Sequence, residues 1–152
     1  MHPDHFSAAT LAENLRRLEA LQPDTQPGWG KMNAPQMLAH LNVAYDMDRD
    51  FTPEDRPNRF ARFMLRTFVK KAVVGPRPYP KNGRTAPAFL ITDQRDFAAE
   101  KAKLIANLKR TVANGPDYYA GRENRSFGQL TTQEWSTLFQ KHLDHHFTQF
   151  GL

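Results

Sequence analysis

The amino-acid sequence predicts an all-α protein, a four-helix bundle with an extra basic amphipathic helix, formed by a single domain over residues 1–152. Three observations carry this prediction. Apolar residues recur at helical spacing in several segments, helix start and stop signals border these segments, and no useful length of chain alternates between apolar and polar residues as a strand does. A chain of this length can also bury a core of its own.

The first helix is expected over residues 7–21. Leu11, Leu15 and Leu18 form one apolar stripe in this segment, because residues three and four apart share a helix face. Pro23 follows and marks a turn after the helix.

The second helix has a clear start signal. Asn33 can cap it, Gln36 stands three residues later in a capping-box position, and Pro35 suits the first turn. His40 lies on the apolar stripe of this helix, which we expect to end near Asp50.

The third helix, expected over residues 58–74, is basic and amphipathic. The surrounding stretch 56–84 carries nine Lys and Arg and no Asp or Glu: Arg56, Arg59, Arg62, Arg66, Lys70, Lys71, Arg77, Lys81 and Arg84. We interpret the helix as a solvated basic face over a buried phenylalanine stripe. Binding of an anionic substrate is a second interpretation, and nucleic acid is disfavoured because no nucleic-acid motif accompanies the charge. Four prolines in residues 75–90 predict an irregular connection.

The fourth helix is expected over residues 93–113, with Asn114-Gly115-Pro116 as its stop. The fifth opens with a capping box from Thr131 to Glu134 and runs almost to the C-terminus. About forty residues separate the second and fourth helices, which suits a crossover between parallel neighbours with the basic helix inside it, whereas short connections elsewhere suit antiparallel neighbours.

Half of the six histidines lie within five consecutive positions of the last helix. At about 100° per residue, His142 and His146 fall in its apolar arc and point into the bundle, while His145 lies at the rim. Gln149 also faces inward, one turn along. Together with His40 from the second helix, the i, i+4 pair predicts a His₃ site for a divalent metal.

Other interpretations of these residues stay open. The three inward histidines can also be hydrogen-bonded core residues, and His145 can replace His146 as the partner of His142. Gln149 can orient a ligand histidine or a bound water, or bond to the backbone. His2 and His5 are expected in a mobile N-terminus and are poor ligand candidates.

Several sequence blocks carry a family resemblance. They are His40 with H-x-x-x-H at His142 and His146; Trp29-Gly30-Lys31-Met32 leading to Gln36-Met37-Leu38-Ala39-His40-Leu41; Pro80-Lys81-Asn82 with Thr85; Phe127-Gly128-Gln129-Leu130-Thr131 with Trp135; and Lys141-His142-Leu143-Asp144-His145-His146 with Gln149-Phe150-Gly151. With these blocks, which span residues 29–151, the chain resembles the DinB-like superfamily of metal-binding four-helix bundles. Within it, the C-terminal KHxDHHxxQFG signature resembles a branch whose activity is not settled.

The resemblance implies an up-down-down-up bundle, a homodimer, and a site in which His40, His142 and His146 bind nickel, zinc or iron. Superfamily members include transferases that use a low-molecular-weight thiol, such as bacillithiol, mycothiol or glutathione, and others described only as metal-dependent hydrolases. We therefore expect a metal-dependent enzyme, a thiol-dependent transferase or a hydrolase, whose small-molecule substrate carries an anionic group. The alternative is a non-enzymatic helical module for dimerisation or ligand binding, with a structural metal or none.

Composition narrows these possibilities. The chain has no cysteine, so thiolate ligands, disulfides and a cysteine nucleophile within the chain are excluded, and an attacking thiol would come from a cofactor. No run of about 18 apolar residues suggests a membrane span, and we expect no membrane partner. The N-terminus lacks a signal pattern, which predicts a cytoplasmic protein.

Overall fold

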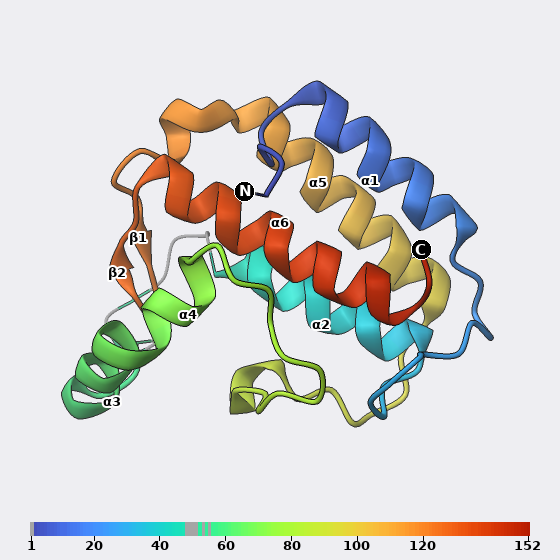
Figure 1. Cartoon of the computed structure of the whole chain (residues 1–152), viewed down its shortest axis with the longest axis horizontal. Helices are drawn as coiled ribbons and strands as arrows, with labels where there is room; N and C mark the ends of the chain where they lie inside the picture. The colour runs from blue at the N-terminus through green and yellow to red at the C-terminus, as the bar shows by residue number, and fades with distance from the viewer. Residues whose placement is uncertain (1, 48–51, 53, 55) are drawn as a thin grey trace.

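The computed structural model describes residues 2–47, 52, 54 and 56–152, and it is mainly helical (Figure 1). The long helices are α1 (Ala8–Ala20), α2 (Ala34–Asp46), α5 (Phe97–Tyr119) and α6 (Thr132–Gln149). Shorter elements are α3 (Arg59–Met64), a π-helical turn (Leu65–Val69), α4 (Lys70–Val74), a 3₁₀ turn (Pro87–Phe89) and the antiparallel strands β1 (Glu123–Asn124) and β2 (Gly128–Gln129). The protein is mostly helical, as predicted, and the small hairpin is a feature that the sequence pattern does not indicate.

Both predicted capping boxes are present. Asn33 Oδ1 accepts from the backbone N–H of Gln36 at 2.9 Å, and Gln36 Oε1 accepts from the backbone N–H of Asn33 at 3.1 Å. Thr131 and Glu134 make the same reciprocal pair at 3.2 and 2.9 Å. These bonds satisfy donors that a helix start leaves without partners, which explains why α2 and α6 begin where they do.

Two helix boundaries differ from those expected. Helix α2 is described as far as Asp46, and Asp50, its predicted end, lies outside the described residues. Helix α5 begins at Phe97 rather than at residue 93, because the Asp96 carboxylate accepts from the third backbone N–H and caps it. The predicted stop is confirmed at Gly115, where a φ of +74° breaks the regular helix, but one more helical turn follows.

The polar contacts fix the directions of the helices. Asn42 Nδ2 of α2 donates to Glu100 Oε2 of α5 at 2.8 Å, and Lys103 pairs with Asp46 farther along both helices. The later residue of α2 contacts the later residue of α5, so the two helices run in the same direction, as Figure 1 shows.

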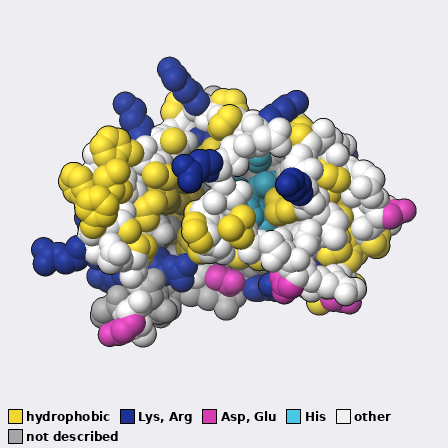
Figure 2. Space-filling model, turned by 90° about the horizontal axis from the view of Figure 1, so that it is seen from below, with side chains coloured by type: hydrophobic (Ala, Val, Ile, Leu, Met, Phe, Trp, Pro, Cys, Tyr) yellow, Lys and Arg dark blue, Asp and Glu magenta, His cyan; other side chains and the backbone are white. Residues whose placement is uncertain are grey.

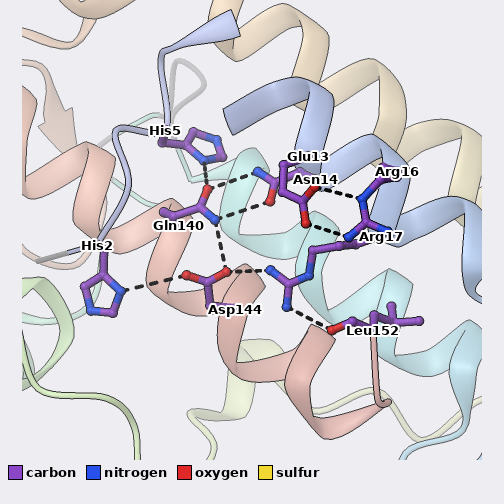
Figure 3. A network of polar contacts seen from close by, with 9 residues as sticks. All are labelled: His2, His5, Glu13, Asn14, Arg16, Arg17, Gln140, Asp144 and Leu152. Carbon is purple, nitrogen blue, oxygen red and sulfur yellow. Dashed lines mark hydrogen bonds and ion pairs between the residues drawn. The ribbon is translucent and has the colours of Figure 1, made fainter. Parts of the chain in front are cut away.

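A network of polar side chains joins α1 to α6 in the same way (Figure 3). Asn14 Nδ2 donates to Gln140 Oε1 at 3.0 Å, and Arg17 Nη1 donates to Asp144 Oδ1 at 2.7 Å. Helices α1 and α6 are therefore also parallel to each other. Asp144 thereby ties the two helices together.

The core lies among the four long helices. Trp135 is completely buried, as the helical spacing predicts. Tyr45 of α2 stacks on Phe139 of α6 with ring centroids 4.7 Å apart, and Phe6 stacks on Tyr119 at 4.9 Å. The N-terminal segment thus closes one side of the core.

The prediction that His5 lies in a mobile N-terminus is wrong. Its side chain is only 1% exposed, and its Nδ1 hydrogen-bonds with Gln140 Oε1 at 3.0 Å. Its backbone N–H donates to Ser136 Oγ at 2.9 Å, and its ring lies 5.2 Å from that of Phe139. The segment is fixed because a polar ring with satisfied hydrogen bonds can be buried at little cost.

His5 should make the stability of the protein depend on pH. Burial lowers the pKa of His5 from 6.5 to about 4, although the hydrogen bond with Gln140 and the charges of Asp4 and Asp144 act in the opposite direction. As the pH falls from 6.5, the pKa of the unfolded chain, towards about 4, the pKa in the folded protein, the unfolded chain binds the proton first. Within this window, His5 should therefore lower the free energy of unfolding by about 1.4 kcal/mol for each pH unit. Urea unfolding of the wild type and of His5→Gln across this window measures the difference, and equal pH slopes would contradict it.

The segment Arg59–Val74, here called the α3–α4 arm, projects at the end of the bundle where β1 and β2 lie (Figure 1). Leu65, Val73 and Val74 pack against the core. Lys141 of α6, only 1% exposed, donates from Nζ to the carbonyl oxygens of Ala72 at 2.6 Å and Gly75 at 2.9 Å. The C-terminal end of the arm is thereby attached to α6.

The predicted buried phenylalanine stripe on this arm is wrong. Phe60, Phe63 and Phe68 are 74, 61 and 64% exposed. Helical spacing identified a common face correctly, but it does not say which face meets the rest of the protein.

Among the described residues, no helix has both the length and the hydrophobicity that crossing a membrane requires.

Candidate metal centre

Three histidines from two helices meet in the structure. His40 comes from α2, and His142 and His146 come from successive turns of α6. Each offers one ring nitrogen, and these nitrogens all lie within 4.8 Å of one another. His40 Nε2 and His142 Nε2 lie 2.9 Å apart. In the described part of the chain, this is the group that could hold a metal ion, and it is the set predicted from the sequence.

Hydrogen bonds fix the orientation of two of the rings. His40 Nδ1 lies 2.8 Å from the carbonyl oxygen of Phe89, and a carbonyl can only accept. The proton is therefore on Nδ1, and the lone pair of His40 is on Nε2, which faces the other histidines. His146 Nδ1 lies 2.7 Å from Gln149 Oε1 and carries its proton for the same reason. Such contacts are typical of histidines that bind metals.

Gln149 both contacts a candidate ligand and bonds to the backbone, the two roles that the sequence left open. Its Nε2 donates to the carbonyl oxygen of Trp29 at 2.6 Å, so its Oε1 is the atom turned to His146. Gly30 provides the room: a Cβ there would lie 2.7 Å from Gln149 Nε2, and its φ is +84°. Glycine is the residue that tolerates this backbone conformation without strain.

His145 is directed elsewhere, as the helical angles predict for a rim residue. Its ring contacts Trp29 at 5.8 Å and Tyr79 at 5.6 Å between centroids. It does not belong to the trio among the described residues. The helical spacing explains this difference. At about 100° per residue, His146 lies about 40° from His142, whereas His145 lies about 60° from it on the other side, away from the centre of the apolar arc.

The electrostatics of the site favour neutral imidazoles. Burial lowers the pKa of His146 to about 3, and the neighbouring His40 adds to the effect. Burial also lowers the pKa of His142 well below 6.5, followed by the influence of His146 and His40. The pKa of His40 is lowered by burial as well, partly offset by the Phe89 carbonyl. Neutral imidazole is the form that binds metals.

A small pocket lies on the His145 side of α6. It has a volume of about 240 Å³, and its walls include Trp29, Tyr79, Lys81 and His145. Lys81 Nζ lies 4.5 Å from the centre of the Trp29 ring. Trp29 is a half-buried wall residue of this pocket. Figure 2 shows histidine side chains at the bottom of a hollow with Lys or Arg side chains on two sides.

Sequence reasoning missed two contributors to this site. The carbonyl of Phe89 belongs to the irregular connection, and a backbone oxygen leaves no signal in the residue pattern. Tyr79 stands between prolines in the same connection, where no periodicity indicates a direction. The ring of Tyr79 lies 6.4 Å from that of His142, so it closes one side of the site.

Comparison with known proteins gives one family. The family model described as "Protein of unknown function (DUF1569)" matches residues 2–151. No curated protein and no solved structure matches the chain. Because the match includes every block around the three histidines, the site lies inside the region that the family model describes. The chain belongs to the DUF1569 family.

Proposed function

We propose that the protein is a metal-dependent enzyme in which His40, His142 and His146 bind one divalent ion. The observation that supports this most is the convergence of three ring nitrogens within 4.8 Å from two separate helices. An ion bound there would supply Lewis-acid chemistry, which makes water or a thiol nucleophilic near neutral pH. Both a hydrolase and a thiol-dependent transferase fit this chemistry.

The side chains around the ion would have separate tasks. Phe89, through its carbonyl, and Gln149 hold the rings of His40 and His146 in the ligating orientation. The 240 Å³ pocket is lined by His145 and Tyr79, whose ring also neighbours that of His142, and it would offer room for a small substrate. Lys81 at its wall would attract an anionic group of that substrate. Because the chain has no cysteine, the transferase version requires an external low-molecular-weight thiol.

The directions of the helices support the DinB-like assignment. Helices α1 and α6 are parallel to each other, as are α2 and α5. Helices α2 and α6 are antiparallel, because the later residue of α2, Tyr45, contacts the earlier residue of α6, Phe139, and His40 contacts His142. These directions support the proposal of an up-down-down-up order, which the resemblance implies. Metal identity, the thiol and the homodimer stay predictions.

One observation favours the alternative, a non-enzymatic helical module. The direct contact of 2.9 Å between His40 Nε2 and His142 Nε2 allows the two rings to satisfy each other without a metal. His40 is also only 4% exposed. A core of hydrogen-bonded histidines would give the same distances between the ring nitrogens. An experiment is therefore needed to distinguish the metal-dependent enzyme from the non-enzymatic module.

Turnover should depend on the metal. The protein, loaded separately with nickel, zinc or iron, is assayed with glutathione, bacillithiol or mycothiol paired with electrophiles, and with small esters and amides. We expect activity with one metal, loss of it after complete removal with a chelator, and recovery when the metal is returned. Activity that persists without metal would contradict the catalytic role, and absence of activity with every loaded metal and pair would favour the alternative.

A further inference from the structure

The outer face of the α3–α4 arm is apolar. Phe60, Phe63 and Phe68 are more than half exposed, and Met64 and Val69 beside them are each 39% exposed. Figure 2 shows hydrophobic side chains gathered at one end of the molecule, with Lys and Arg side chains next to them. Exposing several large apolar side chains on one face is unfavourable in water, so such a patch commonly marks an interaction site.

The arm is firmly attached to the rest of the protein through its inner face. Arg56, just before it, pairs with Glu123 of β1 at 2.8 Å, and Lys70 pairs with Glu134 of α6 at 2.9 Å. Lys141 bonds to the carbonyls at its C-terminal end. The exposed phenylalanines therefore belong to a helix held in a defined orientation, and the body of the protein presents them outwards.

Basic side chains surround the apolar face. Arg59, Arg66 and Lys71 are exposed, and the stretch 56–84 contains no acidic residue. Arg59, Arg62 and Arg66 also line an open cleft of about 450 Å³ beside Phe63. Guanidinium groups in this arrangement suit phosphate oxygens, which they can bind through two hydrogen bonds at once.

We propose that the α3–α4 arm docks on an anionic lipid membrane, with Phe60, Phe63 and Phe68 at the boundary of headgroups and acyl chains and Arg59, Arg66 and Lys71 on the lipid phosphates. A helix with an apolar face bordered by cations has the composition of interfacial membrane helices. This revises our expectation that no membrane takes part, and it does not depend on the metal centre.

Two other occupants fit the charge pattern less well. A second copy of the chain would bring one acid-free basic arm against another, and like charges would repel. Nucleic acid would satisfy the cations, but the aliphatic side chains of Met64 and Val69 have no base-stacking role. An anionic membrane satisfies both parts of the surface.

Flotation with lipid vesicles tests the proposal. The full chain is mixed with vesicles of phosphatidylcholine alone or with added phosphatidylglycerol. We compare it with Phe60→Ser/Phe63→Ser/Phe68→Ser and with Arg59→Gln/Arg66→Gln/Lys71→Gln. The matched controls are Tyr118→Ser, an exposed aromatic outside the arm, and Lys109→Gln, an exposed cation on α5.

We expect binding to the anionic vesicles only, unchanged in both controls. The phenylalanine variant should bind at least about tenfold more weakly, and the charge variant on the order of 100-fold more weakly. Equal thermal midpoints would show that the variants fold. The proposal is overturned by equal binding to neutral vesicles, by variants that bind like the wild type, or by no vesicle binding. In the last case, phenylalanine-dependent binding of DNA or self-association would identify the true occupant.

Discussion

Purified, untagged protein should contain close to one divalent ion per chain, and the His142→Ala variant should contain almost none. His142 is one of the two candidate ligands from α6, and its Nε2 lies 2.9 Å from His40 Nε2. Removing it leaves two ligands from different helices, which bind a divalent ion weakly. Elemental analysis gives the stoichiometry directly. An ion at 100 times its dissociation constant would also stabilise the wild type by about 2.7 kcal/mol, visible as a higher thermal midpoint.

Two further variants test the assignment of individual residues. His145→Gln should keep the metal, because the His145 ring neighbours His146 but does not belong to the trio whose nitrogens converge. Gln149→Leu should keep the stoichiometry but weaken the affinity roughly 10- to 100-fold, because His146 loses its hydrogen-bond acceptor. If the protein contains no metal, and nickel, zinc and iron leave its midpoint unchanged, the metal site is refuted. Loss of metal in the His145 variant would mean that the ligand set is wrong.

The helices and the histidine trio could be predicted because they depend on local patterns. A capping box is satisfied within four residues, and it located the starts of α2 and α6 correctly. The i, i+4 spacing of His142 and His146 fixes their relative direction whatever the rest of the chain does. His40 required one non-local step, that its apolar stripe faces the same core, and the structure brings it to the pair.

The features that could not be predicted depend on contacts between distant segments. The periodicity of the α3–α4 arm indicates one apolar face, but the ion pairs of Arg56 with Glu123 and of Lys70 with Glu134 hold another side of the arm against the protein. His5 looked like a terminal residue, and its partner Gln140 is 135 positions away. The Phe89 carbonyl that fixes His40 is a backbone group, which any residue type would supply.

Replacing Lys141 with methionine should lower the free energy of unfolding by about 2 kcal/mol. The ammonium group of Lys141 is the donor for the carbonyls of Ala72 and Gly75, and methionine fills the same space without a donor. Burial lowers the pKa of Lys141, so part of the gain from these bonds is offset by the cost of removing the charge from water. Lys109→Met, an exposed change on α5, is the matched control and should stay within about 0.5 kcal/mol of the wild type.

Hydrogen exchange shows where the Lys141→Met variant has changed. If Lys141 attaches the arm, the amides of residues 70–75 should exchange faster in the variant, while those of α2 and α5 keep their relative protection. Uniformly faster exchange would mean that Lys141 stabilises the core and not the arm, and unchanged stability would mean that its two bonds merely balance the cost of burial. A loosened arm presents its phenylalanines in no fixed orientation, so the variant should also bind anionic vesicles less well, although every residue of the apolar face is intact. That result would link a buried lysine in α6 to a surface that it does not touch.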